Sequence, residues 1–380
     1  MHKKNFSRLR FFATLSQALT CLAAICAAAR ADSPGRRPPQ PLPPAGDAAP
    51  RADVEDPFVQ LVCDPLVQRE LALNPGQLEA VGRAYAKVDS RLWLLRDVTT
   101  GPGATERVKL LAAVATELEP VLAGPPRVRL DQLATRARGW SGILVDSTAA
   151  RLQLSADQKS QIAAVLSRTR SELQQAATVA DPAAREKAIL EARQREGQDV
   201  QRLLSPEQQQ ALAAAVGKDF DLSQVRPLTF PAPELAEVEA WINSPPLTMH
   251  ALKGKVVAYH FWAFGCINCV HNLPHYAKWH ADLAPRGLVV LGMHTPETQT
   301  ERDVEALKVK VRDEAIMYPV AMDHENRNWA AWANSMWPSV YLVDKRGRVR
   351  YWWYGELNWQ GATGEQFMRQ KIEQLLAEGG

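Results

Sequence analysis

Cysteine is scarce in this sequence, which has five cysteines among 380 residues. Small secreted domains that use disulfides in place of a large core have a much higher cysteine density, so a disulfide framework is excluded. The chain also lacks a strong charge of either sign, since its formal net charge is +3 and no long run of Lys or Arg occurs. Nucleic-acid binding usually needs a concentrated basic surface, and we therefore expect no nucleic-acid partner.

The N-terminal segment has the composition of an export signal. Basic residues at positions 3–10 precede a mostly apolar stretch over residues 11–29, and Ala29-Arg30-Ala31 places small residues where a signal peptidase reads them. We predict a signal peptide over residues 1–31 and an exported, periplasmic protein. The apolar stretch is short and interrupted by polar residues, which is weak for a membrane span. An uncleaved leader would nevertheless leave the protein tethered to the membrane.

Composition divides the rest of the chain into four segments. Residues 32–56 are rich in Pro and small residues and predict an extended linker. Residues 57–220 are rich in Ala, Leu, Gln and Arg with helical periodicity, and they predict an all-helical domain. A second, proline-containing linker is predicted over residues 221–235. Residues 236–380 contain runs of β-branched residues, and we expect the part from about Pro231 onward to fold on its own.

One local pattern recurs in the helical segment. It has the form L-[NS]-x-x-Q and occurs at residues 73–77, 154–158 and 204–208. Asn or Ser can cap the free N–H groups of a helix, with Gln at the third helical position, so each copy predicts a helix start. The pattern resembles the helix openings of the Spy/CpxP family of periplasmic helical proteins. This resemblance implies client binding or self-association through the helical domain.

Strand-like and helix-like stretches alternate in the C-terminal segment. This alternation predicts an α/β domain with a central sheet. The predicted strands are residues 255–262, 288–294, 318–322, 339–343 and 349–354, and the predicted helices are residues 269–285, 302–315, 326–335 and 364–377.

The sequence Cys266-Ile267-Asn268-Cys269 lies between the first of these strands and the helix that follows. A helix N-terminus presents free N–H groups and partial positive charge, which stabilise a thiolate and lower its pKa. The spacing lets one thiolate attack a disulfide and the second sulfur resolve the mixed disulfide. We therefore predict a redox-active pair in which Cys266 is the exposed nucleophile and Cys269 resolves.

Other roles for these cysteines have less support. A zinc site would need two further ligands, and the histidines that follow the pair lie along one helix, so we expect no metal. A structural disulfide that closes a two-residue loop would add little stability. The third cysteine of the mature chain, Cys63, is predicted to act as a small hydrophobic residue. We expect no cofactor.

Several stretches of the C-terminal segment resemble thioredoxin-like domains of the TlpA and DipZ type. They are FWAFGCINCVHNLP at 261–274, VVLGMHTPE at 289–297 and WPSVYLVDKRG at 337–347. The resemblance covers about residues 240–360 and implies a thioredoxin fold behind the helical domain. It also implies exchange with protein thiols and disulfides, and a membrane or periplasmic electron donor that the sequence does not identify. In this family the residue matching Pro338 is a cis-proline that faces the cysteine pair and helps an extended substrate pair with the backbone.

Two positions depart from the thioredoxin pattern. An acid commonly precedes the first cysteine by six residues and moves protons to and from the second thiol, but this chain has His260 there. A histidine can relay protons or can be a neutral core residue, and strand alternation places it with Trp262 beneath the cysteines. Gly265 replaces the Trp that often precedes the first cysteine. His294 and Glu297 lie at the end of the second strand, in MHTPE, and either border the site or belong to an ordinary loop.

These features together predict an exported thiol–disulfide oxidoreductase that reduces or oxidises protein disulfides. One alternative is a thiol peroxidase of the peroxiredoxin type, which would need Pro-x-x-x-Thr/Ser-x-x-Cys where this chain has FWAFG before Cys266. A second alternative is a non-catalytic protein that senses redox state or binds clients. Turnover of a test disulfide separates the second alternative from the enzyme.

Overall fold

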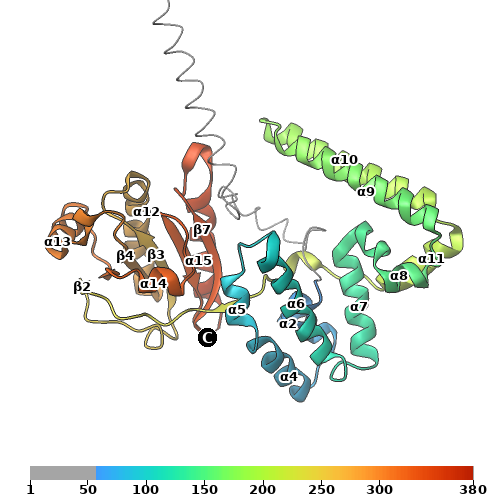
Figure 1. Cartoon of the computed structure of the whole chain (residues 1–380), viewed down its shortest axis with the longest axis horizontal. Helices are drawn as coiled ribbons and strands as arrows, with labels where there is room; N and C mark the ends of the chain where they lie inside the picture. Colours follow the sequence, from blue (N-terminus) through green and yellow to red (C-terminus); the bar gives the residue numbers. More distant parts are fainter. Residues whose placement is uncertain (1–56, 380) are drawn as a thin grey trace, which may run out of the picture.

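The computed structural model describes residues 57–379. The predicted signal peptide (1–31) and first linker (32–56) lie outside the described residues. An N-terminal helical region is followed by a mixed-sheet domain with a thioredoxin-like fold (Figure 1), so the predicted fold class is confirmed. Within residues 57–379, no helix combines the length and apolar character needed to cross a bilayer.

Three helices of the helical region begin at the recurring pattern. Asn74, Ser155 and Ser205 each accept a hydrogen bond from the backbone N–H of the Gln three residues later, and each Gln side chain accepts one in return. These capping boxes satisfy N–H groups that would otherwise lack a partner at the helix start. The helices are α2 (Phe58–Cys63), α3 (Pro65–Glu70), α4 (Pro75–Ala86), α5 (Asp89–Leu94), α6 (Gly101–Leu118), α7 (Pro125–Arg138), α8 (Asp146–Arg151), α9 (Ala156–Ala177), α10 (Pro182–Leu203) and α11 (Pro206–Val216).

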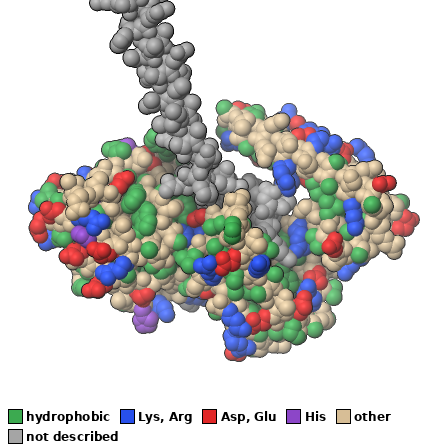
Figure 2. Space-filling model, in the orientation of Figure 1, with side chains coloured by type: hydrophobic (Ala, Val, Ile, Leu, Met, Phe, Trp, Pro, Cys, Tyr) green, Lys and Arg blue, Asp and Glu red, His purple; other side chains and the backbone are tan. Residues whose placement is uncertain are grey.

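Helices α9 and α10 form a long hairpin that projects from the rest of the protein (Figure 1). Its core is small and joins α8–α11, with Ile162, Val165 and Val200 among its buried residues. The Gln158 side chain donates to the Gln208 side chain at 2.8 Å, which ties the starts of α9 and α11 together. Figure 2 shows basic and acidic side chains interspersed over the visible surface.

A seven-stranded sheet forms the C-terminal domain, in the order β1-β7-β6-β3-β4-β5-β2. Strand β3 is central, runs parallel to β4 and antiparallel to β6, and is buried along its whole length. Strands β1 and β2, which sequence patterns did not predict, have two and three residues and lie at the sheet edges. The strands are β1 (Phe230–Pro231), β2 (Ala240–Ile242), β3 (Val256–Trp262), β4 (Leu288–His294), β5 (Val320–Met322), β6 (Ser339–Val343) and β7 (Arg348–Tyr354).

The two faces of the sheet are covered differently. One face packs against α12 (Ile267–Leu283), α13 (Val304–Asp313) and α15 (Gly364–Ala377). On the other face the sheet domain supplies α14 (Arg327–Ala331), a helix of five residues, and the segment before β3 with Met249 and Leu252. The helical region covers the rest of this face of the sheet. Its buried residues form one hydrophobic core with the face.

Trp93 of α5 is the centre of this shared core. Its ring contacts Trp332, Tyr341 and Trp352 with ring centroids 6.0, 5.7 and 5.8 Å away, each in an edge-on arrangement. Aromatic pairs at this separation stabilise a core beyond the area that they bury. The helical region and the sheet are therefore joined by a buried apolar interface.

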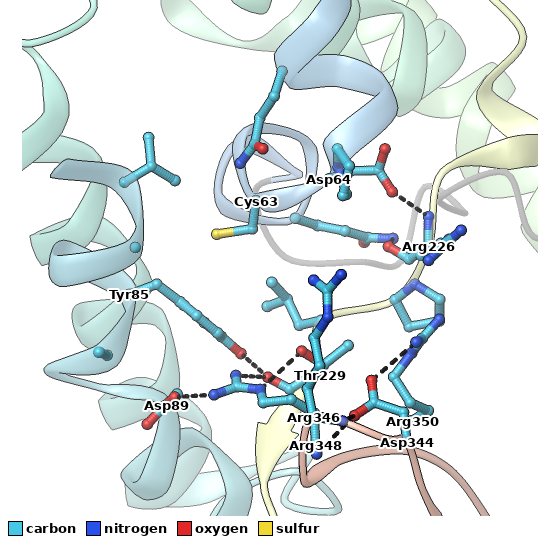
Figure 3. A pocket seen from close by; sticks show the side chains of 18 of the residues that line it. Cys63, Asp64, Tyr85, Asp89, Arg226, Thr229, Asp344, Arg346, Arg348 and Arg350 are labelled. Carbon is cyan, nitrogen blue, oxygen red and sulfur yellow. Dashed lines mark hydrogen bonds and ion pairs between the residues drawn. The ribbon is translucent and has the colours of Figure 1, made fainter. Parts of the chain in front are cut away.

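Polar contacts surround a pocket at the margin of this interface (Figure 3). Arg348 of β7 forms an ion pair with Asp89 at 2.9 Å, and the Tyr85 hydroxyl donates to the Thr229 carbonyl at 3.0 Å. Cys63 faces this pocket, and burial raises the pKa of its thiol to about 12. Its thiol is therefore protonated at neutral pH and a poor nucleophile.

The shared core gives a physical reason to expect a loss of stability when the helical region is removed, while the expectation that the part beginning at Pro231 folds on its own stays a prediction. We expect a fragment of residues 231–380 to bind a hydrophobic dye and to melt well below the chain that begins at residue 57. The fragment lacks Trp93, and removing a buried Trp alone costs about 3–5 kcal/mol. Thermal unfolding by circular dichroism tests this prediction, and equal melting temperatures for the two proteins would contradict it.

Candidate active site

The cysteine pair lies where β3 passes into α12. Cys266 is the N-cap of α12, and its backbone N–H donates to the Ala263 carbonyl at 3.2 Å, closing the turn after the strand. The sulfur of Cys266 accepts a hydrogen bond from the backbone N–H of Cys269 at 3.3 Å. The sulfur thus takes the place of the usual side-chain oxygen cap, which favours negative charge on it.

The two thiols of the pair have opposite properties. The hydrogen bond from the Cys269 side chain, with backbone N–H groups of α12, lowers the pKa of Cys266 to about 7 despite partial burial. Cys269 is 0% exposed. Its burial, and then the hydrogen bond to Cys266, raise the pKa of Cys269. At neutral pH Cys266 is therefore readily ionised, while Cys269 keeps its proton.

A buried carboxylate fixes the loop that leads to Cys266. Glu301 is 2% exposed, and its Oε1 accepts the backbone N–H of Gly265 at 2.7 Å. Its Oε2 accepts the backbone N–H groups of Glu297 at 2.9 Å and Thr298 at 2.7 Å. Burial opposes ionisation, but these backbone hydrogen bonds hold the pKa of Glu301 below its usual value. Glu301 therefore joins the loop after β4 to the loop before the nucleophile.

Glu301 also explains the glycine that precedes Cys266. A Cβ at position 265 would lie 2.9 Å from Oε1 of Glu301, closer than a methyl group can approach. Sequence inspection missed Glu301 as a site residue. The available signals were Gly265 itself and the spacing of Thr298 and Glu301, which form a capping box.

Substitution of Gly265 should therefore destabilise the site. We expect Gly265→Ala to displace the Glu301 carboxylate and to lower the free energy of unfolding by about 1–3 kcal/mol. Gly82 in α4 is the matched control, because no heavy atom lies within 4 Å of the position that a Cβ would take there. Gly82→Ala should be neutral or stabilise the helix by up to about 1 kcal/mol. Urea unfolding of both variants checks the prediction, which an unchanged Gly265→Ala variant would contradict.

His260 lies on β3, on the face that packs against α12. It is 0% exposed, and its ring stacks on Tyr276 with centroids 4.1 Å apart. Neither ring nitrogen forms a hydrogen bond with the part of the chain that the structure describes. Burial lowers the pKa of His260 to about 3. The imidazole is therefore neutral at neutral pH.

Pro338 lies at the same end of the sheet as the cysteine pair. The peptide bond between Trp337 and Pro338 is cis, and Pro338 is buried while Trp337 is half-buried. Phe261 of β3 pairs with Ser339 of β6, so Pro338 is next to Trp262 in the antiparallel register. The Trp337 indole N–H donates to the Thr295 carbonyl at 3.2 Å, beyond the end of β4.

His294 and Glu297 also border the site. The ring of His294 stacks on Phe264 with centroids 5.1 Å apart and is edge-on to Trp262 at 5.4 Å. Burial lowers the pKa of His294 to about 4. Glu297 is exposed, and its negative charge acts against ionisation of Cys266. Among residues 57–379, no group of three or more His, Cys, Asp or Glu side chains is placed to hold a metal ion.

Comparison with known proteins assigns the C-terminal part of the chain. Residues 231–352 match the AhpC/TSA family. This part of the chain is an AhpC/TSA redoxin domain. The match begins after the helical region, so it adds no support for the resemblance of that region to Spy/CpxP proteins.

Curated relatives agree with this assignment. Protein DipZ of Mycobacterium tuberculosis is 38% identical over 128 residues, which are 33% of this chain and 18% of DipZ. The thiol-disulfide oxidoreductase YkuV of Bacillus subtilis is 25% identical over 148 residues, which are 39% of this chain and 95% of YkuV. This chain thus covers about a fifth of the length of DipZ. Thiol–disulfide oxidoreductases are among its homologues, in agreement with the TlpA/DipZ-type resemblance.

A solved structure matches the same share of the chain. The structure of a thiol-disulfide isomerase from Corynebacterium glutamicum is 29% identical. The match covers 39% of this chain and 98% of that chain, with a TM-score of 0.34.

Proposed function

We propose that this protein is an exported thiol–disulfide oxidoreductase that exchanges disulfides with other proteins. The observation that carries the proposal is the asymmetry of the cysteine pair at the start of α12. Cys266 is partly exposed and has its pKa lowered to about 7, whereas Cys269 is buried and has its pKa raised. One sulfur is thus ready to attack and the other is held back as a thiol, which is the division of roles that exchange requires.

The reaction in the reducing direction has two steps. The Cys266 thiolate attacks one sulfur of a substrate disulfide, and the other substrate sulfur leaves as a thiolate and takes up a proton. Cys269 then loses its proton and attacks the sulfur of Cys266. The second substrate thiol is released, and a Cys266–Cys269 disulfide remains. Two electrons pass to the substrate, and the reverse sequence oxidises a substrate dithiol.

The test is turnover of a protein disulfide. The purified chain, with dithiothreitol as the reductant, should accelerate the reduction of insulin, and equilibration with glutathione should give the reduction potential of the pair. A potential near that of thioredoxin would assign a reductant, and one near that of DsbA an oxidant. Peroxide consumption without insulin turnover would favour the thiol peroxidase. Binding of insulin without any turnover would favour the non-catalytic alternative.

Export and partners belong to the same proposal. Export rests on the basic and apolar composition of residues 1–31, and the TlpA/DipZ-type resemblance supports a periplasmic or membrane electron donor. The Spy/CpxP-like helix starts support client binding or self-association through the helical region. Mass spectrometry of the protein from a periplasmic fraction tests export, because cleavage of the predicted signal peptide gives Asp32 as the first residue.

A further inference from the structure

One arginine of the helical region reaches across the shared core to the sheet domain. Arg96 follows α5, its side chain is 3% exposed, and its guanidinium lies 3.7 Å from the centroid of the Trp93 ring. Its Nη2 donates to the Ala333 carbonyl at 3.0 Å and to the Tyr341 hydroxyl at 3.2 Å. Its Nε donates to the Tyr354 hydroxyl at 3.2 Å. A buried guanidinium with this many partners holds them in a fixed geometry.

The hydrogen bonds continue from Tyr341 into the segment of residues 333–339. The Tyr341 hydroxyl donates to Oδ1 of Asn334 at 2.7 Å, and the Ser339 hydroxyl donates to the same oxygen at 2.8 Å. Nδ2 of Asn334 donates to the Met336 carbonyl at 3.1 Å. Arg96 therefore supports this segment twice, directly at Ala333 and through Tyr341 and Asn334.

This segment is a wall of the candidate active site. It contains the cis peptide bond between Trp337 and Pro338, next to Trp262 in the sheet. Trp337 packs against the same core cluster as Phe264 and Cys266. Residues 333–339 thus border the end of the sheet at which Cys266 lies, where a protein substrate would contact them.

We propose that Arg96 is a positioning residue, through which the helical region orders residues 333–339 for binding of protein disulfides. This inference rests on the proposed function. The contacts of Arg96 described above include neither cysteine, so its role concerns the binding of a large substrate and not the chemistry of the thiolate. A protein disulfide must contact the segment, whereas a small disulfide can reach Cys266 without it.

Three variants separate this role from general loosening of the interface. Arg96→Met keeps the apolar stem and removes the donors, and Arg96→Lys keeps the charge but lacks the planar set of donors. Tyr341→Phe keeps the ring beside Trp93 and removes only the hydroxyl between Arg96 and Asn334. The matched control is Arg348→Met, because Arg348 joins α5 to β7 through Asp89 with no hydrogen bond or ion pair to residues 333–339 among the described contacts.

The experiment compares insulin reduction with reduction of 2-hydroxyethyl disulfide, and records amide hydrogen exchange of residues 333–339 by mass spectrometry. Arg96→Met and Arg96→Lys should each raise KM for insulin by about tenfold, the loss expected for one or two hydrogen bonds. Tyr341→Phe should raise KM for insulin by less than Arg96→Met does. The double variant of Arg96→Met and Tyr341→Phe should have nearly the same KM as Arg96→Met alone. The kcat for insulin and the rate with the small disulfide should not change. Amide exchange of the segment should become faster.

Several outcomes would overturn the inference. An equal rise of KM in Arg348→Met would mean that any loosening of the interface has the same effect. An equal loss of rate with 2-hydroxyethyl disulfide would mean that Arg96 affects the cysteine pair itself and not the binding of a protein substrate. If the wild-type chain reduces neither disulfide, the proposed function fails. Amide exchange still decides whether Arg96 orders residues 333–339. Unchanged exchange of these residues in Arg96→Met would refute the role of Arg96.

Discussion

Replacement of Cys266 by serine should reduce insulin turnover by on the order of 10³-fold or more, because the reaction loses its nucleophile. The structure gives this cysteine a pKa of about 7, so its rate of alkylation should rise with pH below 7 and level off above it. A serine hydroxyl is not ionised anywhere in this range. Turnover of insulin, measured at equal concentrations of folded protein, gives the size of the effect.

The other two cysteines of the described chain serve as controls for this prediction. Cys269→Ser should keep the attacking thiolate and accumulate mixed disulfides with insulin, because no second sulfur releases the substrate. Cys63→Ser should keep full turnover, since Cys63 lies in the pocket beside Asp64 and Tyr85, away from the pair. Full activity of Cys266→Ser, or loss of activity in Cys63→Ser, would contradict the assignment of the nucleophile.

The parts of the site that could be predicted from sequence are those that depend on neighbours in the chain. Cys266 and Cys269 are three residues apart at a helix start, and the hydrogen bond between the Cys269 N–H and the Cys266 sulfur is local. The strand β3 could be predicted because its seven residues form one largely apolar run, as expected for a strand buried on both faces. Helix caps at Asn74, Ser155 and Ser205 follow from the same kind of local pattern.

The parts that could not be predicted depend on contacts between distant residues. Glu301 is 36 positions from Gly265, and Arg96 is 245 positions from Tyr341, so only the folded chain brings them together. The shared core has the same origin, because Trp93 occurs in an ordinary amphipathic helix and its aromatic partners follow more than a hundred residues later. Periodicity shows that a helix face is apolar, but it does not show which surface will cover it.

Lowering the pH from neutral toward 4 should destabilise the protein, and His260 should account for a large part of that loss. The pKa of His260 falls from 6.5 to about 3 because the ring is buried. Between these two values the unfolded chain binds a proton that the native chain does not, so stability is full above pH 6.5 and decreases as pH falls toward 3. Each pH unit within this window lowers the free energy of unfolding by about 1.4 kcal/mol. The total loss between pH 6.5 and pH 5 is therefore about 2 kcal/mol. His294, whose pKa falls to about 4, adds a loss of the same sign.

The variant His260→Leu tests both hypotheses for this residue. A leucine has a similar volume and does not titrate. Between pH 7 and pH 5 the free energy of unfolding of the variant should therefore fall by about 2 kcal/mol less than that of the wild type. His250→Gln, at an exposed position, is the control and should behave as the wild type. A buried imidazole that is neutral down to about pH 3 accepts protons poorly at neutral pH, and we expect His260→Leu to exchange disulfides at the wild-type rate there. A slower exchange in the folded variant, with unchanged acid stability, would instead establish His260 as the proton relay for Cys269.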